Sequence, residues 1–222
     1  MGSIFHGGTS MTQAAESAIT LDRFRKGKTF QEYLDSGIRN RELFERNYRD
    51  LKISDAQAAA LRAATAKSGG LHHMVVIGED WCPDVYRGLG VAQRIAEAAG
   101  IELRMFERDQ NRDMIAEYLK DGQFESIPVF VFYDRNHREI GHFIERPALA
   151  NTQMPMMRDV LGDTSPEGIA RQLGHEPSED EIKTARAAAR DRYLEWQQGE
   201  VWAGWRVATV DEVIALIGAA TP

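Results

Sequence analysis

Residues 79–85 of the chain read Glu-Asp-Trp-Cys-Pro-Asp-Val, and the apolar run Met-Val-Val-Ile at 74–77 comes shortly before them. A short apolar run of this kind is typical of a strand buried on both faces. From about Asp84 to Ala99 the pattern predicts a helix, which ends at Gly100. Cys82 therefore lies between a buried strand and the first turn of a helix. Pro83 suits that turn, because its missing N–H is not needed there.

The position of Cys82 at the start of a helix affects how readily its thiol loses a proton. The first backbone N–H groups of a helix have no partner within it, and together with the helix dipole they favour negative charge. A cysteine placed there is stabilised as the thiolate, which attacks disulfides, peroxides and electrophilic carbon. The carboxylates of Glu79, Asp80 and Asp84 flank the thiol and oppose thiolate formation. The sequence leaves open which influence prevails, and an inert, buried cysteine is the alternative.

The middle of the chain predicts a mixed sheet with helices on its faces. After the first strand and helix we expect a strand at Ile101–Phe106, a short helix at Asn111–Leu119, and strands at Ile127–Phe132 and Glu139–Phe143. A strand-helix-strand unit requires a right-handed crossover and parallel pairing. The last two strands are joined by a short turn, so they pair antiparallel. The expected fold class is therefore α/β.

This arrangement resembles the thioredoxin superfamily. The matching segments are Trp81-Cys82-Pro83-Asp84 and Ser126-Ile127-Pro128-Val129-Phe130, and the resemblance covers roughly residues 71–146. It implies a thioredoxin-like three-layer sandwich in which the proline before the third strand is cis and lies against the redox cysteine. Pro128 corresponds to that proline, and Cys82 to the catalytic cysteine. By the same resemblance the substrate contacts are Trp81, Pro83, Asp84, Val85, Ile127 and Pro128.

One position departs from the family pattern. The family loop usually reads Trp-Cys-Pro-Asp-Cys or Trp-Cys-Gly-Asp-Cys, so its second cysteine falls at position 85, where this chain has Val85. In a dithiol enzyme the second thiol resolves the mixed disulfide that the first one forms. We therefore predict monothiol exchange at Cys82, with resolution by an outside thiol. The expected partners are protein or small-molecule thiols and disulfides, glutathione among them.

A second hypothesis needs no reactive thiol. The fold would be kept for binding a partner or for self-assembly, with dithiol activity lost at Val85. Val85 would then fill the core in place of the lost sulfur, and Trp81 would either contact a partner or simply pack. A homodimer stays open as well, because three tryptophans of the tail either pack it onto the sheet or bury a dimer interface. These are Trp196, Trp202 and Trp205.

Helical extensions are expected on both sides of the thioredoxin-like core. Residues 1–20 are interpreted as a flexible leader or tag, 21–70 as an N-terminal helical extension, 71–146 as the core and 147–222 as a C-terminal helical extension. The wider chain resembles a bacterial thioredoxin-like family with such additions, and the N-terminal segments 29–34 and 40–44 fit that family too.

Pairs of polar residues predict where the outer helices begin. In each pair the spacing is that of a capping box, in which two side chains satisfy free backbone N–H groups reciprocally. The pairs are Thr29–Glu32, Ser54–Gln57, Ser178–Glu181 and Thr209–Glu212. Residues 146–164 show no such pattern, and we interpret them as an irregular loop.

Composition limits the classes of partner. The chain has 222 residues, 43% of them hydrophobic and 27% charged, which is ordinary for a globular protein. Its formal net charge of −7 argues against nucleic acid and against an anionic membrane surface, because both require a basic face. No apolar run reaches the roughly 18 residues that span a bilayer.

Cysteine and histidine usage indicates a reducing compartment and no bound metal. A single cysteine excludes an internal disulfide, so we expect a cytoplasmic protein. The six histidines show no metal-ligand spacing with one another or with Cys82. We therefore predict neither a metal site nor a cofactor.

Overall fold

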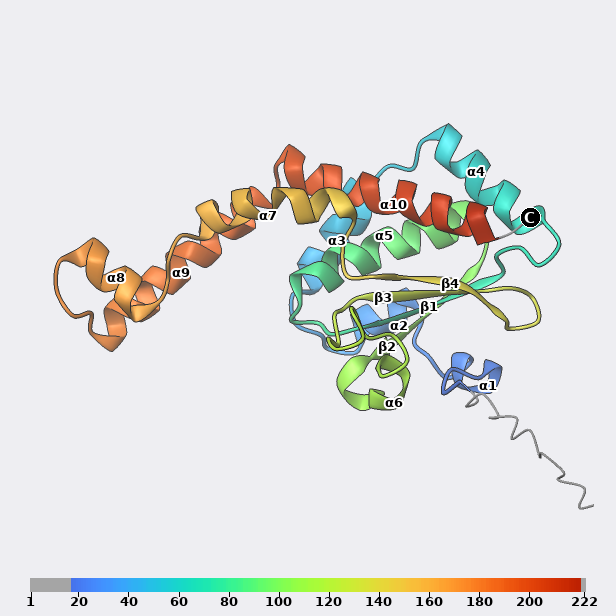
Figure 1. Cartoon of the computed structure of the whole chain (residues 1–222), viewed down its shortest axis with the longest axis horizontal. Coiled ribbons are helices and arrows are strands. Elements are labelled where there is room, and N and C mark those ends of the chain that lie inside the picture. The colour runs from blue at the N-terminus through green and yellow to red at the C-terminus, as the bar shows by residue number, and fades with distance from the viewer. Residues whose placement is uncertain (1–16, 221–222) are drawn as a thin grey trace, which may run out of the picture.

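A four-stranded mixed sheet forms the centre of the protein (Figure 1). The structure is a computed structural model and describes residues 17–220. The strands are β1 (His73–Gly78), β2 (Glu102–Glu107), β3 (Val129–Tyr133) and β4 (Glu139–Ile144), in the spatial order β2-β1-β3-β4. β2 runs parallel to β1, whereas β3 pairs antiparallel with both β1 and β4. The mixed α/β sheet expected from the sequence is confirmed.

Helices cover both faces of this sheet and bury its central strands (Figure 1). Every residue of β1 and β3 is buried, which explains their continuous apolar sequences. α3 (Arg41–Asp50), α4 (Asp55–Ala66), α5 (Pro83–Ala99) and α10 (Glu200–Ala220) lie on one side, and α1 (Leu21–Phe24) and α6 (Arg112–Ile115) on the other. The layers agree with the expected sandwich. None of the helices within residues 17–220 is long and apolar enough to cross a membrane.

The N-terminal segment covers the edge of the sheet at β2. Lys28 pairs with Met105 in an isolated antiparallel bridge, and α2 (Phe30–Asp35) contacts β2. Covering an edge strand removes a template for pairing with another chain. Residues 1–16 of the expected leader lie outside the described residues, whereas Ile19 is buried and Thr20 caps α1. The last four residues of that leader therefore pack with the folded body.

Side-chain caps begin several helices where the sequence predicts them. Thr29–Glu32, Ser54–Gln57 and Ser178–Glu181 each form both hydrogen bonds of a capping box, at the starts of α2, α4 and α9 (Glu179–Trp196). α5 ends at Gly100, whose φ of 70° favours a residue without a β-carbon. All of these signals are local, which is why the sequence alone predicts them.

The predicted start of the last helix at Thr209 is wrong. α10 begins at Glu200 and continues to Ala220, so Thr209 lies in its middle. The Thr209 hydroxyl donates to the carbonyl oxygen of Trp205 at 2.8 Å and accepts from Arg87 at 3.3 Å. A threonine inside a helix can satisfy its hydroxyl on the preceding turn, so capping-box spacing by itself does not mark a helix start.

Residues 146–164, interpreted as a loop, contain a helix instead. α7 spans Ala148–Leu161 and holds Pro155 in its interior. An interior proline removes a helical hydrogen bond and costs about 3 kcal/mol, so Pro155 by itself disfavours a helix here. Packing against α9 and the burial of Ala150 offset this cost. Tertiary contacts therefore decide the structure of this stretch.

α7, α8 (Pro166–Leu173) and α9 form an arm that extends away from the sheet (Figure 1). An aromatic cluster holds its base, where the Trp196 ring centroid lies 5.7 Å from that of Trp202 and 5.3 Å from that of Trp205. Trp202 and Trp205 are each 1% exposed, and the Trp202 indole donates to the side chain of Asn47 in α3. These two rings therefore join the tail to the body within one chain.

Candidate functional site

The loop after β1 and the loop before β3 meet at one end of the sheet. β1 and β3 are antiparallel neighbours, with Ile77 paired to Val129, so one strand ends beside the start of the other. Cys82 is partly exposed at the N-cap of α5, and its thiol donates to the carbonyl oxygen of Ile127 across 3.8 Å. The Ile127–Pro128 peptide bond is cis, as predicted. The sulfur thus lies directly beside the cis-proline loop.

A glycine in α5 allows Pro128 to lie against the helix. A β-carbon placed on Gly88 would meet Cγ of Pro128 at 2.7 Å and the ring of Phe130 at 3.3 Å. Carbon atoms in favourable contact are about 3.5–4.0 Å apart. Only a residue without a side chain therefore lets α5, the cis-proline loop and β3 come together here. No local pattern in the sequence points to Gly88, because a glycine inside a helix looks unfavourable until the neighbouring loop is known.

Val85 faces the core of the protein. It is fully buried, and its methyl carbons lie 2.7 and 2.9 Å from where a β-carbon on Gly78 would stand. The position of the family's second cysteine is therefore filled by packed hydrocarbon. This confirms the interpretation of Val85 as a core residue, and Cys82 remains the only thiol of the chain.

Asp84 is held in a buried network of ions. Its carboxylate accepts from Arg87 at 2.7 Å and pairs with Arg146 at 2.8 Å. Arg87 is 1% exposed and also donates to the Thr209 hydroxyl and to the carbonyl oxygen of Glu145. Removing one partner of a buried ion pair leaves the other charge uncompensated and lowers the stability of the fold by about 3–5 kcal/mol. Asp84 therefore ties the start of α5 to the end of β4 and to α10.

The surroundings of Cys82 disfavour its thiolate. Burial raises the pKa of the thiol above its ordinary value, and the charges of Asp84 and Glu145 raise it further. The backbone N–H groups of Val85 and Asp84 lower the pKa, as expected at a helix start, but they do not outweigh the other influences. The hydrogen bond to Ile127 also favours the protonated form, since a thiolate has no proton to donate. The question left open by the sequence is thus answered in favour of the thiol.

Glu145 stays charged at the end of β4. Burial raises the pKa of its carboxyl, but the hydrogen bond from Lys120 and the charges of Arg146 and Lys120 lower it by more. The Glu145 backbone N–H donates to the Pro128 carbonyl oxygen at 2.7 Å, and its φ of 69° is uncommon for a residue with a β-carbon. Glu145 thus helps to hold the cis-proline loop in place, a role that its sequence position did not indicate.

The acidic residues before the thiol tie the loop to its neighbours. Glu79 is buried and accepts a hydrogen bond from the backbone N–H of Asp109 at 2.7 Å, and burial raises the pKa of its carboxyl. Asp80 accepts from the backbone N–H of Arg39 at 2.7 Å through its side chain, and from the Asn40 amide at 3.1 Å through its carbonyl. The turn before α3 is therefore fixed relative to the Cys82 loop.

A family model described as thioredoxin matches residues 27–159, which is more than half of the chain. The chain belongs to this thioredoxin family. The match begins before α2 and ends within α7, so it extends beyond the stretch 71–146 that carries the resemblance in the sequence.

Solved structures share the fold of this thioredoxin-family protein. A Pseudomonas aeruginosa protein of unknown function is 17% identical, with a TM-score of 0.58, and the match covers 89% of this chain and 96% of that one. An HIV epitope scaffold is 18% identical, with a TM-score of 0.55 and coverage of 88% and 95%. At these identities the likeness shows the fold alone. The search of curated proteins found no match.

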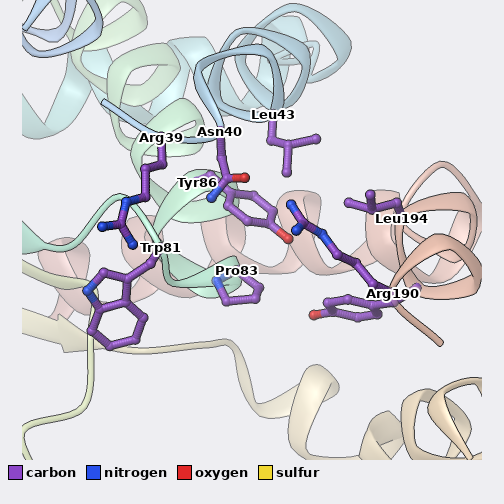
Figure 2. Close-up of a pocket in the computed structure, with 9 residues that line it drawn as sticks. Arg39, Asn40, Leu43, Trp81, Pro83, Tyr86, Arg190 and Leu194 are labelled. Carbon is purple, nitrogen blue, oxygen red and sulfur yellow. The ribbon is translucent and has the colours of Figure 1, made fainter. Parts of the chain in front are cut away.

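The thioredoxin-family protein has a cleft of about 520 Å³ beside the Cys82 loop (Figure 2). Side chains from the start of α3, from the loop and α5, and from α9 line this cleft. They are Arg39, Asn40, Leu43, Trp81, Pro83, Tyr86, Arg190, Tyr193 and Leu194. Trp81 and Pro83, which flank Cys82, were singled out in the sequence. Trp81 is 47% exposed, and the guanidinium of Arg108 lies 5.4 Å from its ring centroid.

α9 contributes one helical face to the cleft. Arg190, Tyr193, Leu194 and Gln197 follow the spacing i, i+3, i+4, i+7. The Gln197 amide donates to the hydroxyl oxygen of Tyr86 at 2.6 Å, so this face docks onto α5. These residues could not be recognised from the sequence, because it shows their spacing but not the element that this helical face contacts.

The described histidines near β1 lie at the other end of that strand from the thiol. His73 and His137 share a hydrogen bond of 2.7 Å, and a ring nitrogen of His72 lies 3.3 Å from one of His73. Within residues 17–220, no group of three or more histidine, cysteine, aspartate or glutamate side chains is arranged to hold a metal ion.

Proposed function

We propose that this protein carries out thiol–disulfide exchange through Cys82 alone. The observation that carries the proposal is the position of Cys82, a partly exposed residue whose sulfur lies 3.8 Å from the Ile127 carbonyl oxygen that precedes a cis proline. An extended thiol or disulfide lying along the Ile127–Pro128 backbone would bring its sulfur to this place. Trp81, Pro83 and the loop backbone would bound the same space.

The exchange needs two steps and no other oxidant. The Cys82 thiolate attacks one sulfur of a disulfide R–S–S–R′, the S–S bond breaks as Cys82–S–S–R forms, and R′–S⁻ leaves with the electron pair. A second thiolate, R″–S⁻, then attacks the R sulfur, and Cys82 leaves as thiolate while R–S–S–R″ is released. Val85 has no thiol and cannot resolve the mixed disulfide. The resolving thiol therefore comes from another molecule, and a reducing cytoplasm would supply such thiols.

Thiolate formation limits this reaction. Burial, Asp84 and Glu145 raise the pKa of Cys82, so only a small fraction of the protein is thiolate near neutral pH. We expect slow exchange at pH 7 and faster exchange as the pH rises. A partner that supplies a positive charge beside the sulfur would raise the thiolate fraction.

Adduct formation tests the proposal directly. The protein is incubated with bis(2-hydroxyethyl) disulfide, and the mixed disulfide on Cys82 is followed by mass spectrometry as a function of pH. We expect an adduct that forms faster at high pH, that added glutathione removes, and that Cys82→Ser abolishes. No adduct on the folded protein at a pH above the pKa of the thiol would reject the exchange.

A second function, a binding module without chemistry, is favoured by two observations. The raised pKa of Cys82 and the packed Val85 describe a thiol that the fold does not activate. In that case Cys82→Ser would leave folding, assembly and partner binding unchanged. A clear loss of assembly or of partner binding in a Cys82→Ser protein of native thermal stability would reject the module.

A further inference from the structure

The cleft beside the Cys82 loop is positively charged. Arg39 and Arg190 line it, and its lining contains no carboxylate. Within residues 17–220, neither guanidinium forms an ion pair or a hydrogen bond with another side chain. In Figure 2 the two arginines stand on different walls, Arg39 on the side of Trp81 and Arg190 on α9, with Tyr86 and Pro83 between them. A protein with a net charge of −7 thus has a local site for an anion.

The backbone segments that carry the two arginines are held in place relative to the Cys82 loop. The backbone N–H of Arg39 donates to Asp80, two residues before Cys82. Arg190 is placed by the base of the arm, where Gln197 donates to Tyr86 of α5. The helix that carries Arg190 is thereby attached to the helix that begins at Cys82. Two charges positioned in this way can select a ligand by the spacing of its own charges.

The polar atoms of the cleft suit carboxylates. A guanidinium offers planar pairs of N–H donors that match a carboxylate. The oxygen of Tyr86 accepts from Gln197, so its own O–H remains available as a third donor. Burial raises the pKa of Tyr86 to about 12, which keeps that proton in place at neutral pH. Pro83 and Leu194 contribute apolar surface to the cleft. The volume of the cleft lies in the range of small-molecule sites.

We propose that this cleft binds a small disulfide or thiol that carries two carboxylates, one held by Arg39 and the other by Arg190. Cys82 does not itself line the cleft, but Trp81 and Pro83 on either side of it do, so the sulfur of the bound molecule would extend from the cleft past this loop to the Cys82 thiol. This inference rests on the proposed exchange and names its substrate class. The arm then has a function, since α9 supplies half of the charge that selects the substrate.

Binding is measured first without chemistry. The probe is S-methylglutathione, which has two carboxylates and no free thiol, titrated into the Cys82→Ser protein by calorimetry. We expect Arg39→Gln and Arg190→Gln each to weaken binding by about tenfold or more, because each removes a charge-assisted contact. The diethyl ester of the probe lacks both carboxylate charges and should bind more weakly by a similar or larger factor.

The matched control is Arg62→Gln. Arg62 lies on α4, is exposed and does not line the cleft, and its replacement changes the net charge by the same amount. The affinity of the Arg62→Gln variant for the probe should stay within about twofold of that of the protein with Cys82→Ser alone, since salt screens a charge outside the cleft. Thermal unfolding of all three variants checks that the arm stays docked. Equal affinity in the two cleft variants and the control would overturn the inference.

A kinetic comparison separates this inference from the exchange itself. Glutathione disulfide and bis(2-hydroxyethyl) disulfide are compared as donors of the adduct on Cys82, in the parent protein and in Arg39→Gln and Arg190→Gln. The substitutions should slow adduct formation from the anionic glutathione disulfide. They should leave the rate with the neutral bis(2-hydroxyethyl) disulfide unchanged. Reaction with the neutral donor without a preference for the anionic one would reject the cleft and keep the exchange. Binding of the probe through both arginines without any adduct would reject the exchange and keep the cleft.

Discussion

Gly88 and Pro128 are in direct contact across the site, because the helix offers no side chain at the point where the cis proline lies. A β-carbon on Gly88 would stand 2.7 Å from Cγ of Pro128. The same proline follows Ile127, whose carbonyl oxygen accepts from the Cys82 thiol. The spacing between thiol and cis-proline loop therefore depends on a glycine one and a half turns along the helix.

Replacing this glycine should separate the two loops. Gly88→Ala gains helix propensity worth about 1 kcal/mol but overpacks the contact, which costs about 1–3 kcal/mol. We expect a net loss of stability and slower adduct formation at Cys82. The free energy of unfolding in urea and the rate of reaction with bis(2-hydroxyethyl) disulfide measure the two effects.

Gly204 provides the matched control for that substitution. It also lies inside a helix, α10, but a β-carbon there would meet nothing within 4 Å. Gly204→Ala should therefore stabilise the protein by up to about 1 kcal/mol and leave the reaction rate unchanged. If both alanine variants are stabilised equally, the contact between Gly88 and Pro128 does not constrain the site.

Val85→Cys should restore a dithiol loop. Position 85 lies one turn after Cys82, and the Val85 backbone N–H donates to the Cys82 carbonyl oxygen at 3.0 Å. The new thiol would take the place of the buried valine side chain at a cost of about 1 kcal/mol. We expect reduction of insulin disulfides, measured as turbidity in the presence of dithiothreitol, well above the level of the natural chain.

Val85→Ala separates the thiol from the loss of packing. Both substitutions remove methyl groups that face Gly78, but only one adds a sulfur. Val85→Ala should be no more active than the natural chain. Equal turbidity with the two variants would mean that position 85 cannot serve as the resolving position in this fold.

Asp84→Asn should make the thiol more acidic and the protein less stable. The charge of Asp84 raises the pKa of Cys82, so its removal lowers that pKa. The substitution also leaves Arg87 buried without its carboxylate partner, at a cost of about 3 kcal/mol or more. Ultraviolet absorbance of the thiolate against pH reports the first effect, and urea unfolding the second.

Glu42→Gln is the control for this pair of effects. Glu42 is an exposed carboxylate on α3, and the same change in net charge there should leave both measurements unchanged. An Asp84→Asn protein of native stability would contradict the structural role of the buried pair. An unchanged pKa of Cys82 would contradict the electrostatic one.

A chain of histidines should make stability depend on pH. The Ile19 carbonyl oxygen can only accept, so His137 donates to it through Nε2 and accepts from Nε2 of His73 through Nδ1. His73 can donate this bond in its neutral or its protonated form, so the bond does not by itself set the charge of His73. Burial, followed by the charges of His137 and His72, lowers its pKa from 6.5 to about 4.

Because the folded-state pKa of His73 is depressed, the unfolded chain binds more protons between these two values. Stability should therefore fall as the pH drops from about 6.5 towards about 4, by up to roughly 3 kcal/mol from this group. Urea unfolding of the parent and of His73→Gln across this range isolates the contribution. The stability difference between them should shift in favour of His73→Gln as the pH falls, and a constant difference would contradict the prediction.

Local signals in the sequence were enough to predict the core. The capping boxes at Thr29, Ser54 and Ser178, the apolar strand before residue 79 and the proline at 128 each act over a few residues. Their order along the chain restricts the sheet topology, because crossovers are right-handed and short turns pair strands antiparallel. The expectation that Cys82 lies beside a cis proline comes from the resemblance of the segments at 81–84 and 126–130 to the thioredoxin superfamily, and the structure has this geometry.

Tertiary packing decided what those signals could not. The helix of residues 148–161 exists in spite of Pro155 because α9 packs against it, and Thr209 lies inside α10 because its hydroxyl is satisfied within the fold. The pKa of Cys82 rises because burial and two carboxylates outweigh the helix end, a balance set by distances. The cleft of Arg39 and Arg190 joins residues that are remote in sequence. Such contacts depend on how faces dock in space, which no local pattern records.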